Sequence, residues 1–168
     1  PANPLKNSLV QDTYEPGSTF KIVTAAAALE DAMVREDETF FCENGRWQLS
    51  PGVLISDHEP AGDLTLPGIM EQSSNIGIAK VVERIGATRF YRQARAFGFG
   101  SKSGVPLPGE TSGELRPDSA RTRVGLASSS YGYGIAVSAL QLLGAYSAIA
   151  NRGTLFEPSL LLNDRKPN

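Results

Sequence analysis

The chain has 168 residues, which is long enough for one domain with a hydrophobic core. Hydrophobic residues make up 40% of it and charged residues 20%, the composition of an ordinary globular protein. The net charge is −2 without a basic stripe, so nucleic acid is not an expected partner, and no apolar run reaches the length of a membrane helix.

The chain contains one cysteine, Cys42, and one histidine, His58. A single cysteine excludes an internal disulfide, and these two residues cannot form a zinc site by themselves, so no metal or cofactor is expected. We interpret Cys42 as a structural residue and His58 as a solvated loop residue. The chain begins at Pro1 without a methionine or a signal peptide, so we expect it to be a segment of a longer protein.

The first third of the chain is predicted to form a loop, a helix and a hairpin. Residues 1–17 are polar and rich in proline and asparagine, which is typical of a loop. Residues 18–34 are predicted to form a buried helix, because they contain an alanine-rich run that is apolar nearly all round. Residues 39–42 and 46–49 flank an Asn-Gly pair that favours a tight turn, so a short hairpin is expected there.

The middle of the chain is predicted to form a connector followed by three helices. Residues 50–63 are rich in turn-forming residues. Thr65 is a suitable N-cap for the first helix, and Gly86 is expected to end the second. The three helices are expected at residues 64–70, 75–85 and 88–97.

The last third is predicted to form a loop and two helices. Residues 99–116 are rich in glycine and proline and are expected to be irregular, with Glu110 as a candidate anchor of this loop. Residues 117–127 are predicted to form a short helix. Residues 138–151 are predicted to form a longer one that ends before Gly153, with a buried face made of Leu140, Leu143, Tyr146 and Ala150. Sequence that favours strands is scarce, so the chain is expected to be mainly α.

A first candidate site lies at the predicted start of the helix over residues 18–34. Pro16 and Gly17 favour a turn there, and Ser18 and Lys21 are three residues apart, so they share one helix face. A serine hydroxyl becomes a good nucleophile when a neighbouring base takes its proton, and a lysine amine can do so if burial lowers its pKa. The spacing alone is also compatible with a serine N-cap followed by a surface lysine.

A second candidate site lies before the helix over residues 75–85. Ser73 could relay a proton to a leaving group, and Asn75 could hydrogen-bond a substrate amide. Taken alone, the same residues could equally serve as an ordinary helix N-cap. Two such motifs at two helix starts, in this order, are much less expected by chance than either one.

Together these segments resemble class B penicillin-binding proteins. Residues 14–21, Tyr-Glu-Pro-Gly-Ser-Thr-Phe-Lys, are similar to the nucleophile motif of that family, and residues 73–77 are similar to its S-x-N motif. Further similar segments are residues 107–110, 131–135 and 140–151. The resemblance covers nearly the whole chain and implies the helical part of the β-lactamase and transpeptidase-like α+β fold.

The resemblance implies a serine D,D-transpeptidase that cross-links peptidoglycan. Ser18 would then attack the D-Ala-D-Ala carbonyl of a stem peptide, with Lys21 as its base. Ser73 would pass a proton to the leaving D-alanine, and Asn75 would orient the substrate. β-Lactam antibiotics would acylate Ser18, and proteins of the division or elongation complex would be partners. The full protein would be anchored at the outer face of the bacterial cytoplasmic membrane.

The third family motif, K-[ST]-G, is expected on a strand that lines the active site. The triplet Lys102-Ser103-Gly104 fits the pattern, but it stands between glycines and prolines and is not expected in a central strand. We therefore interpret residues 1–168 as a partial transpeptidase domain without the third motif, and expect the segment alone to be nearly inactive.

Two alternative functions share Ser18 and Lys21. A serine β-lactamase would hydrolyse the drug, whereas a transpeptidase stays acylated. Class D β-lactamases have S-x-V as the second motif, so Asn75 argues against that class. A β-lactam sensor would keep the nucleophile without cross-linking peptidoglycan. The segment over residues 131–135 favours the class B proteins.

Overall fold

The computed structural model describes residues 6–30, 32–117 and 122–161. Contacts divide the chain into two compact units. The large unit consists of residues 17–93 and 116–134, and the small unit consists of residues 1–16, 94–115 and 135–168. Within the described residues no helix combines the length and the apolar character needed to cross a membrane.

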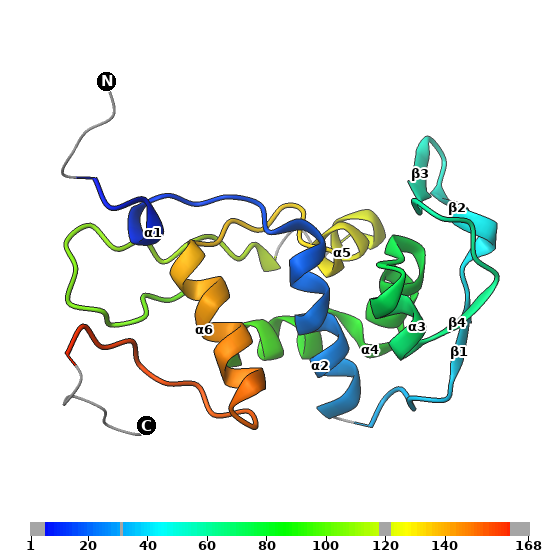
Figure 1. Cartoon of the computed structure of the whole chain (residues 1–168). Coiled ribbons are helices and arrows are strands. Elements are labelled where there is room, and N and C mark those ends of the chain that lie inside the picture. The colour runs from blue at the N-terminus through cyan, green and yellow to red at the C-terminus, as the bar shows by residue number, and fades with distance from the viewer. Residues whose placement is uncertain (1–5, 31, 118–121, 162–168) are drawn as a thin grey trace. The chain divides into compact units, whose positions relative to one another are not determined.

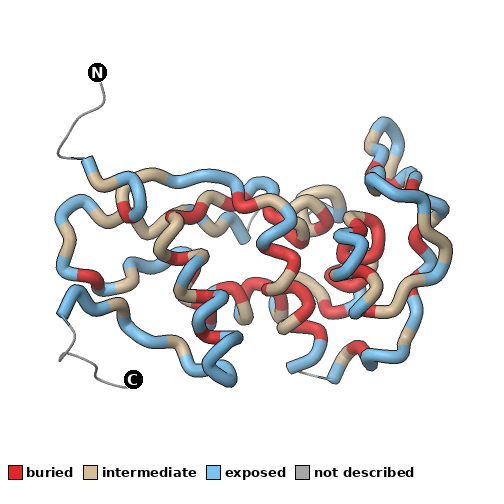
Figure 2. The backbone as a smooth tube through the Cα atoms, viewed as in Figure 1, coloured by how far each residue is buried: buried red, intermediate tan, exposed pale blue. Residues whose placement is uncertain are grey.

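The large unit begins with a 3₁₀ turn, η1 (Gly17–Phe20), which runs directly into α2 (Lys21–Glu30). The inner residues of α2 are buried, as its alanine-rich sequence predicts (Figure 2). The helix ends four residues before the predicted Val34. Ala32 adopts a φ of 49°, and the N–H of Met33 donates to the carbonyl oxygen of Ala28 over 3.1 Å, an arrangement that closes the helix early.

In the described part of the chain, four strands form two separate antiparallel pairs, which are labelled in Figure 1. Strand β1 (Thr39–Phe41) pairs with β4 (Asp63–Thr65), and β2 (Arg46–Ser50) pairs with β3 (Val53–Ser56). The predicted hairpin between residues 39–42 and 46–49 is therefore wrong.

The turn expected to close that hairpin has a different conformation. Glu43, Asn44 and Gly45 all have positive φ and form a short 3₁₀ turn, η2 (Glu43–Gly45), after which the chain enters a different sheet. The hairpin that does form is closed by Pro51 and Gly52, with a φ of 78° at the glycine, as a Pro-Gly turn favours.

Three helices complete the large unit. α3 (Leu66–Glu71) begins at its predicted cap, where Thr65 Oγ1 accepts a hydrogen bond from the N–H of Gly68 over 3.4 Å. α4 (Asn75–Ala96) is broken at Gly86, which has a φ of 78° and a ψ of 160°, so the predicted two helices are confirmed. α5 (Arg123–Ser130) begins later than predicted, and part of the predicted helix, residues 118–121, lies outside the described residues.

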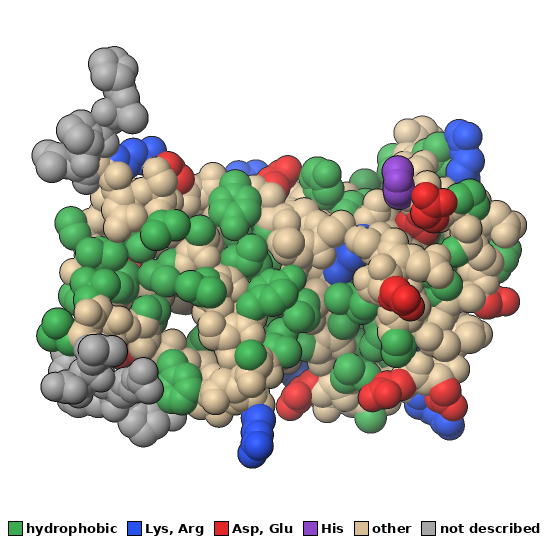
Figure 3. All heavy atoms as spheres, viewed as in Figure 1, with side chains coloured by type: hydrophobic (Ala, Val, Ile, Leu, Met, Phe, Trp, Pro, Cys, Tyr) green, Lys and Arg blue, Asp and Glu red, His purple; other side chains and the backbone are tan. Residues whose placement is uncertain are grey.

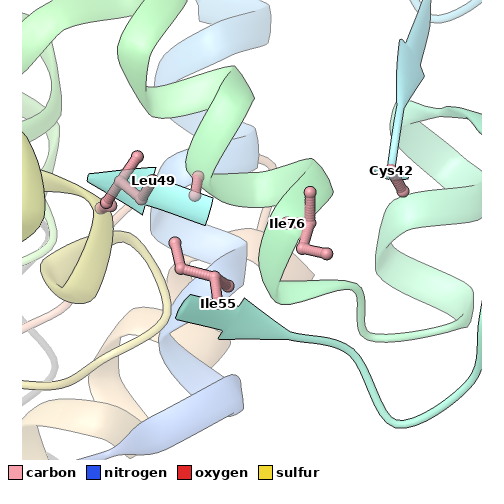
Figure 4. Close-up of a cluster of buried hydrophobic side chains, with 6 residues drawn as sticks. Cys42, Leu49, Ile55 and Ile76 are labelled. Carbon is pink, nitrogen blue, oxygen red and sulfur yellow. The ribbon is translucent and has the colours of Figure 1, made fainter. Parts of the chain in front are cut away.

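A buried cluster joins the sheets and helices of the large unit. It consists of Cys42, Leu49, Ile55, Ile76, Ala79 and Ala127, four of which are labelled in Figure 4. Beside it, the half-buried indole of Trp47 has two cations over its ring, Lys80 Nζ at 4.9 Å and the Arg123 guanidinium carbon at 5.1 Å from the ring centroid. These contacts tie β2 to both α4 and α5.

The small unit contains α1 (Ser8–Gln11), α6 (Ala139–Ala150) and the irregular loop predicted after residue 98. The four-residue α1 lies within the predicted N-terminal loop. Ser138 and Gln141 form a capping box at the start of α6, and Gln141 Nε2 also donates to the carbonyl oxygens of Ser101 and Ser112, each over 2.8 Å. The side chain of Gln141 thereby fastens the loop to the helix.

The buried face of α6 differs from the predicted one. Its buried residues are Gln141, Ala145 and Ala148, whereas Leu143 and Tyr146 are exposed. Figure 3 shows hydrophobic side chains gathered over α6 on the face in view. Because α6 is apolar nearly all round, hydrophobic periodicity does not distinguish which side packs inward.

Candidate active site

Ser18 lies in η1, one helical turn ahead of Lys21. Side chains three residues apart eclipse each other in a 3₁₀ helix, so Ser18 and Lys21 share one face. Ser18 is exposed, whereas the side chain of Lys21 is buried, at 1% exposure. The exposed hydroxyl of Ser18 and the buried amine of Lys21 therefore lie one helical turn apart on the same face.

The backbone around Ser18 is held by the segment that follows α5. The N–H of Gly17 donates to the carbonyl oxygen of Gly132 over 3.3 Å, and a Cβ added to Gly132 would lie 2.3 Å from the carbonyl oxygen of Gly17. Glycine at position 132 is thus what allows the two backbones to approach. One turn further along α2, Thr24 Oγ1 donates to the carbonyl oxygen of Ser130 over 2.9 Å.

The amine of Lys21 contacts the second motif. Its Nζ donates to Ser73 Oγ over 2.9 Å and also to the carbonyl oxygen of Ser73. Burial lowers the pKa of Lys21 to about 8, while the negative charge of Asp57 acts to raise it. With this pKa, about a tenth of the amine is neutral at pH 7 and able to accept a proton, far more than for an ordinary lysine.

Ser73 and Asn75 stand at the entry to α4. Asn75 is the first residue of the helix, and Ser73 lies two residues before it with a left-handed φ of 55°. Ser73 is exposed, while Asn75 is partly buried and its Nδ2 donates to the carbonyl oxygen of Ser56 over 3.1 Å. The structure thus brings Lys21 and Ser73 into direct contact through segments 52 residues apart in the sequence.

Asp57 is part of this site, although no sequence motif points to it. Its Oδ1 accepts from the N–H groups of Asn75 and Ile76 over 2.6 and 3.0 Å, and its Oδ2 accepts from Ser74 Oγ over 2.6 Å. It therefore caps α4 from 18 residues upstream. An acidic residue in a turn-rich connector is a common pattern, so sequence carries little signal for this role.

The structure also places the other residues that were considered from the sequence. Lys102-Ser103-Gly104 is in the irregular loop, where Glu110 Oε1 accepts from both the N–H and the Oγ of Ser103, over 2.6 and 2.5 Å. Glu110 is thus the loop anchor expected for it. His58 is exposed, and Cys42 is free and buried in the core. The described residues contain no group of metal-binding side chains.

The arrangement provides the parts of a serine acyl-transfer site. It has an exposed hydroxyl on Ser18, a buried amine of lowered pKa on Lys21, and a second hydroxyl on Ser73 hydrogen-bonded to that amine. A proton taken from the first hydroxyl by the amine can be delivered through the second one to a leaving group. Asn75 follows Ser73 by two residues, and its side-chain amide is oriented by the hydrogen bond to the carbonyl oxygen of Ser56.

Comparison with known proteins gives consistent matches over nearly the whole chain. Residues 1–167 match the family described as Penicillin binding protein transpeptidase domain. The chain is 36% identical to Stage V sporulation protein D of Bacillus subtilis over 91% of this chain and 24% of that protein. It is 32% identical to Peptidoglycan D,D-transpeptidase FtsI of Escherichia coli over 91% of this chain and 26% of that protein.

A solved structure agrees with these sequence matches. The apo transpeptidase domain of penicillin-binding protein 3 from Burkholderia pseudomallei superposes with a TM-score of 0.89 at 34% identity. The match covers 96% of this chain and 49% of that one. The mainly helical fold class predicted from the sequence is therefore confirmed, and the chain spans about a quarter of the length of the curated relatives named above.

Proposed function

Because the chain belongs to the penicillin-binding protein transpeptidase domain family, and resembles its class B members, we propose that it supplies the nucleophile of a peptidoglycan D,D-transpeptidase. The observation that supports this most directly is the contact of Lys21 Nζ with Ser73 Oγ, one helical turn from Ser18. This contact links the S-x-x-K motif to the S-x-N motif, so that a proton taken up by Lys21 can pass to Ser73.

In the proposed reaction, Ser18 Oγ attacks the carbonyl carbon between the two D-alanines of a stem peptide. Lys21 takes the hydroxyl proton as the new C–O bond forms. The C–N bond then breaks, Ser73 delivers a proton to the leaving amine and takes the proton held by Lys21, and free D-alanine departs. The acyl group on Ser18 is transferred to the amine of a second stem peptide, which loses a proton as the new C–N bond forms, and that proton returns to Ser18 Oγ.

Two features prepare this chain for the acylation step. The pKa of Lys21, about 8 because of burial, suits a base that works near neutral pH. The side chain of Asn75, held by Ser56, is suited to orient the peptide amide next to Ser18. A β-lactam would enter the same path as the acyl donor and remain attached to Ser18.

We further propose that residues 1–168 are one part of the transpeptidase domain, carrying the S-x-x-K and S-x-N motifs. The chain covers about half of the compared B. pseudomallei domain, and the K-[ST]-G motif would belong to the remaining part. The complete protein would act at the outer face of the cytoplasmic membrane, with division or elongation proteins as partners.

Covalent labelling by a fluorescent penicillin tests the proposal. In a protein with the complete domain, the label should map to Ser18, and Ser18→Ala should abolish it. The isolated 168-residue chain should react at least ~10²-fold more slowly, because one oxyanion donor of the family lies on the third-motif strand. Rapid hydrolysis of the drug would indicate a β-lactamase, and persistent labelling of Ser18→Ala would disprove the role of Ser18.

A further inference from the structure

Asp57 connects the second motif to the β2–β3 hairpin. It directly follows β3, and its own N–H donates to the carbonyl oxygen of Gly45 over 3.1 Å. Its carboxylate accepts three hydrogen bonds from residues 74–76, as described above. Asp57 is therefore held by its backbone to the turn that precedes β2 and by its carboxylate to the start of α4.

Ser73, immediately before this set of hydrogen bonds, has an unusual backbone conformation. A φ of 55° is disfavoured for a residue with a side chain, so surrounding contacts must hold it in place. Lys21 bonds both the carbonyl oxygen and the Oγ of Ser73. Asp57 fixes the next three residues, so Ser73 is held directly by the amine of Lys21 and indirectly, through residues 74–76, by the carboxylate.

We propose that Asp57 is a positioning residue for acyl transfer, which holds Ser73 and Asn75 in register with Lys21 through Ser74 Oγ and the two N–H groups at the start of α4. This inference rests on the proposed function. It assigns Asp57 an indirect part, since it touches residues 74–76 and not the reacting hydroxyl of Ser18.

The charge of Asp57 predicts a change in the pH dependence of acylation that helix capping alone would not cause. Its negative charge acts to raise the pKa of Lys21, in opposition to burial. Removing the charge should therefore lower the pH at which the amine becomes neutral. Asp57→Asn should move the midpoint of the acylation pH profile to lower pH, an effect that loss of a structural cap elsewhere cannot produce.

The test is to measure acylation of a protein with the complete domain by a fluorescent penicillin across pH. At pH values above its midpoint, Asp57→Asn should be acylated up to about 10²-fold more slowly than the wild type. A loss of that size is expected if Ser73 shifts by about 1 Å. The matched control is Thr122→Ala, which removes the Oγ1 cap that bonds the N–H of Gly125 at the start of α5. Its rate per folded molecule and its pH midpoint should match those of the wild type.

A second variant keeps the test decisive if Asp57→Asn does not fold. Ser74→Ala removes one of the three hydrogen bonds to Asp57, together with the bond that Ser74 Oγ accepts from the N–H of Gly77. Asp57 Oδ1 still caps α4, so the variant should give an intermediate loss of rate. A wild-type rate and midpoint in folded Asp57→Asn, or a wild-type rate in Ser74→Ala, would overturn the positioning role. If the wild type itself does not label at Ser18, the proposed function fails, and with it this inference.

Discussion

Replacing Gly132 with alanine should disturb the nucleophile more than it disturbs the rest of the fold. The added Cβ would lie 2.3 Å from the oxygen and 2.6 Å from the nitrogen of Gly17, both of them backbone atoms that cannot rotate away. To restore ordinary contact, the turn that carries Ser18 must retreat by about 1 Å. A displacement of that size near reacting atoms typically costs about 10² in rate.

The substitution should also lower the free energy of unfolding. Gly132 has a φ of 85°, and a left-handed conformation costs a residue with a side chain roughly 1–2 kcal/mol. Overpacking against Gly17 should add about 1–3 kcal/mol. Gly134→Ala is the matched control, because Gly134 has a φ of 71° but no atom within 4 Å of the added Cβ, so it should show the conformational cost alone.

The assay compares both variants by urea unfolding and by labelling with a fluorescent penicillin in a protein with the complete domain. Gly132→Ala should lose more stability than Gly134→Ala and label about 10²-fold more slowly, while Gly134→Ala should label at nearly the wild-type rate. Equal losses in the two variants would show that the backbone contact between Gly132 and Gly17 does not position the nucleophile.

Three further outcomes are expected. Because burial lowers the folded-state pKa of Lys21 to about 8, the unfolded chain binds more protons between about pH 8 and 10.5. The unfolding free energy of the wild type, relative to that of Lys21→Met, should therefore rise as the pH rises through that window. If denaturant titrations show that this difference does not change with pH, the lowered pKa of Lys21 is contradicted. Burial also raises the pKa of the Cys42 thiol, so alkylation followed by mass spectrometry should be slow until the large unit unfolds. Lys102→Ala should leave penicillin labelling unchanged, since Lys102 is an exposed loop residue, and a loss of labelling would assign it the third motif.

Local signals in the sequence predict much of the helical structure. Thr65 and Gly86 act within one turn of the helix ends they define, so capping preferences are sufficient to find them. Strand pairing depends on distant residues, and for that reason the pairing of β1 with β4 was not predictable from the Asn44-Gly45 turn. The inward face of α6 was mispredicted for a related reason, because an almost uniformly apolar helix has no periodic signal.

The candidate site likewise combines residues that local sequence predicts with one that only the folded chain brings into place. Ser18 and Lys21 are three residues apart, so their shared face follows from helix geometry. Ser73 and Asn75 are recognisable from their place before a predicted helix and from the resemblance to a known family. The contribution of Asp57 arises only in the folded chain, where β3 carries its carboxylate to the start of α4. No spacing rule links an aspartate to a helix that starts 18 residues later.

The position of Trp47 gives the chain an internal optical reporter. It is the one tryptophan in the sequence, and its ring contacts Lys80 and Arg123, which is possible only when β2, α4 and α5 are assembled. Its emission should therefore follow the large unit and be insensitive to the small one. Circular dichroism records the helices of both units. A fluorescence transition that separates from the dichroism transition would reveal two cooperative units, and coincident transitions would reveal one.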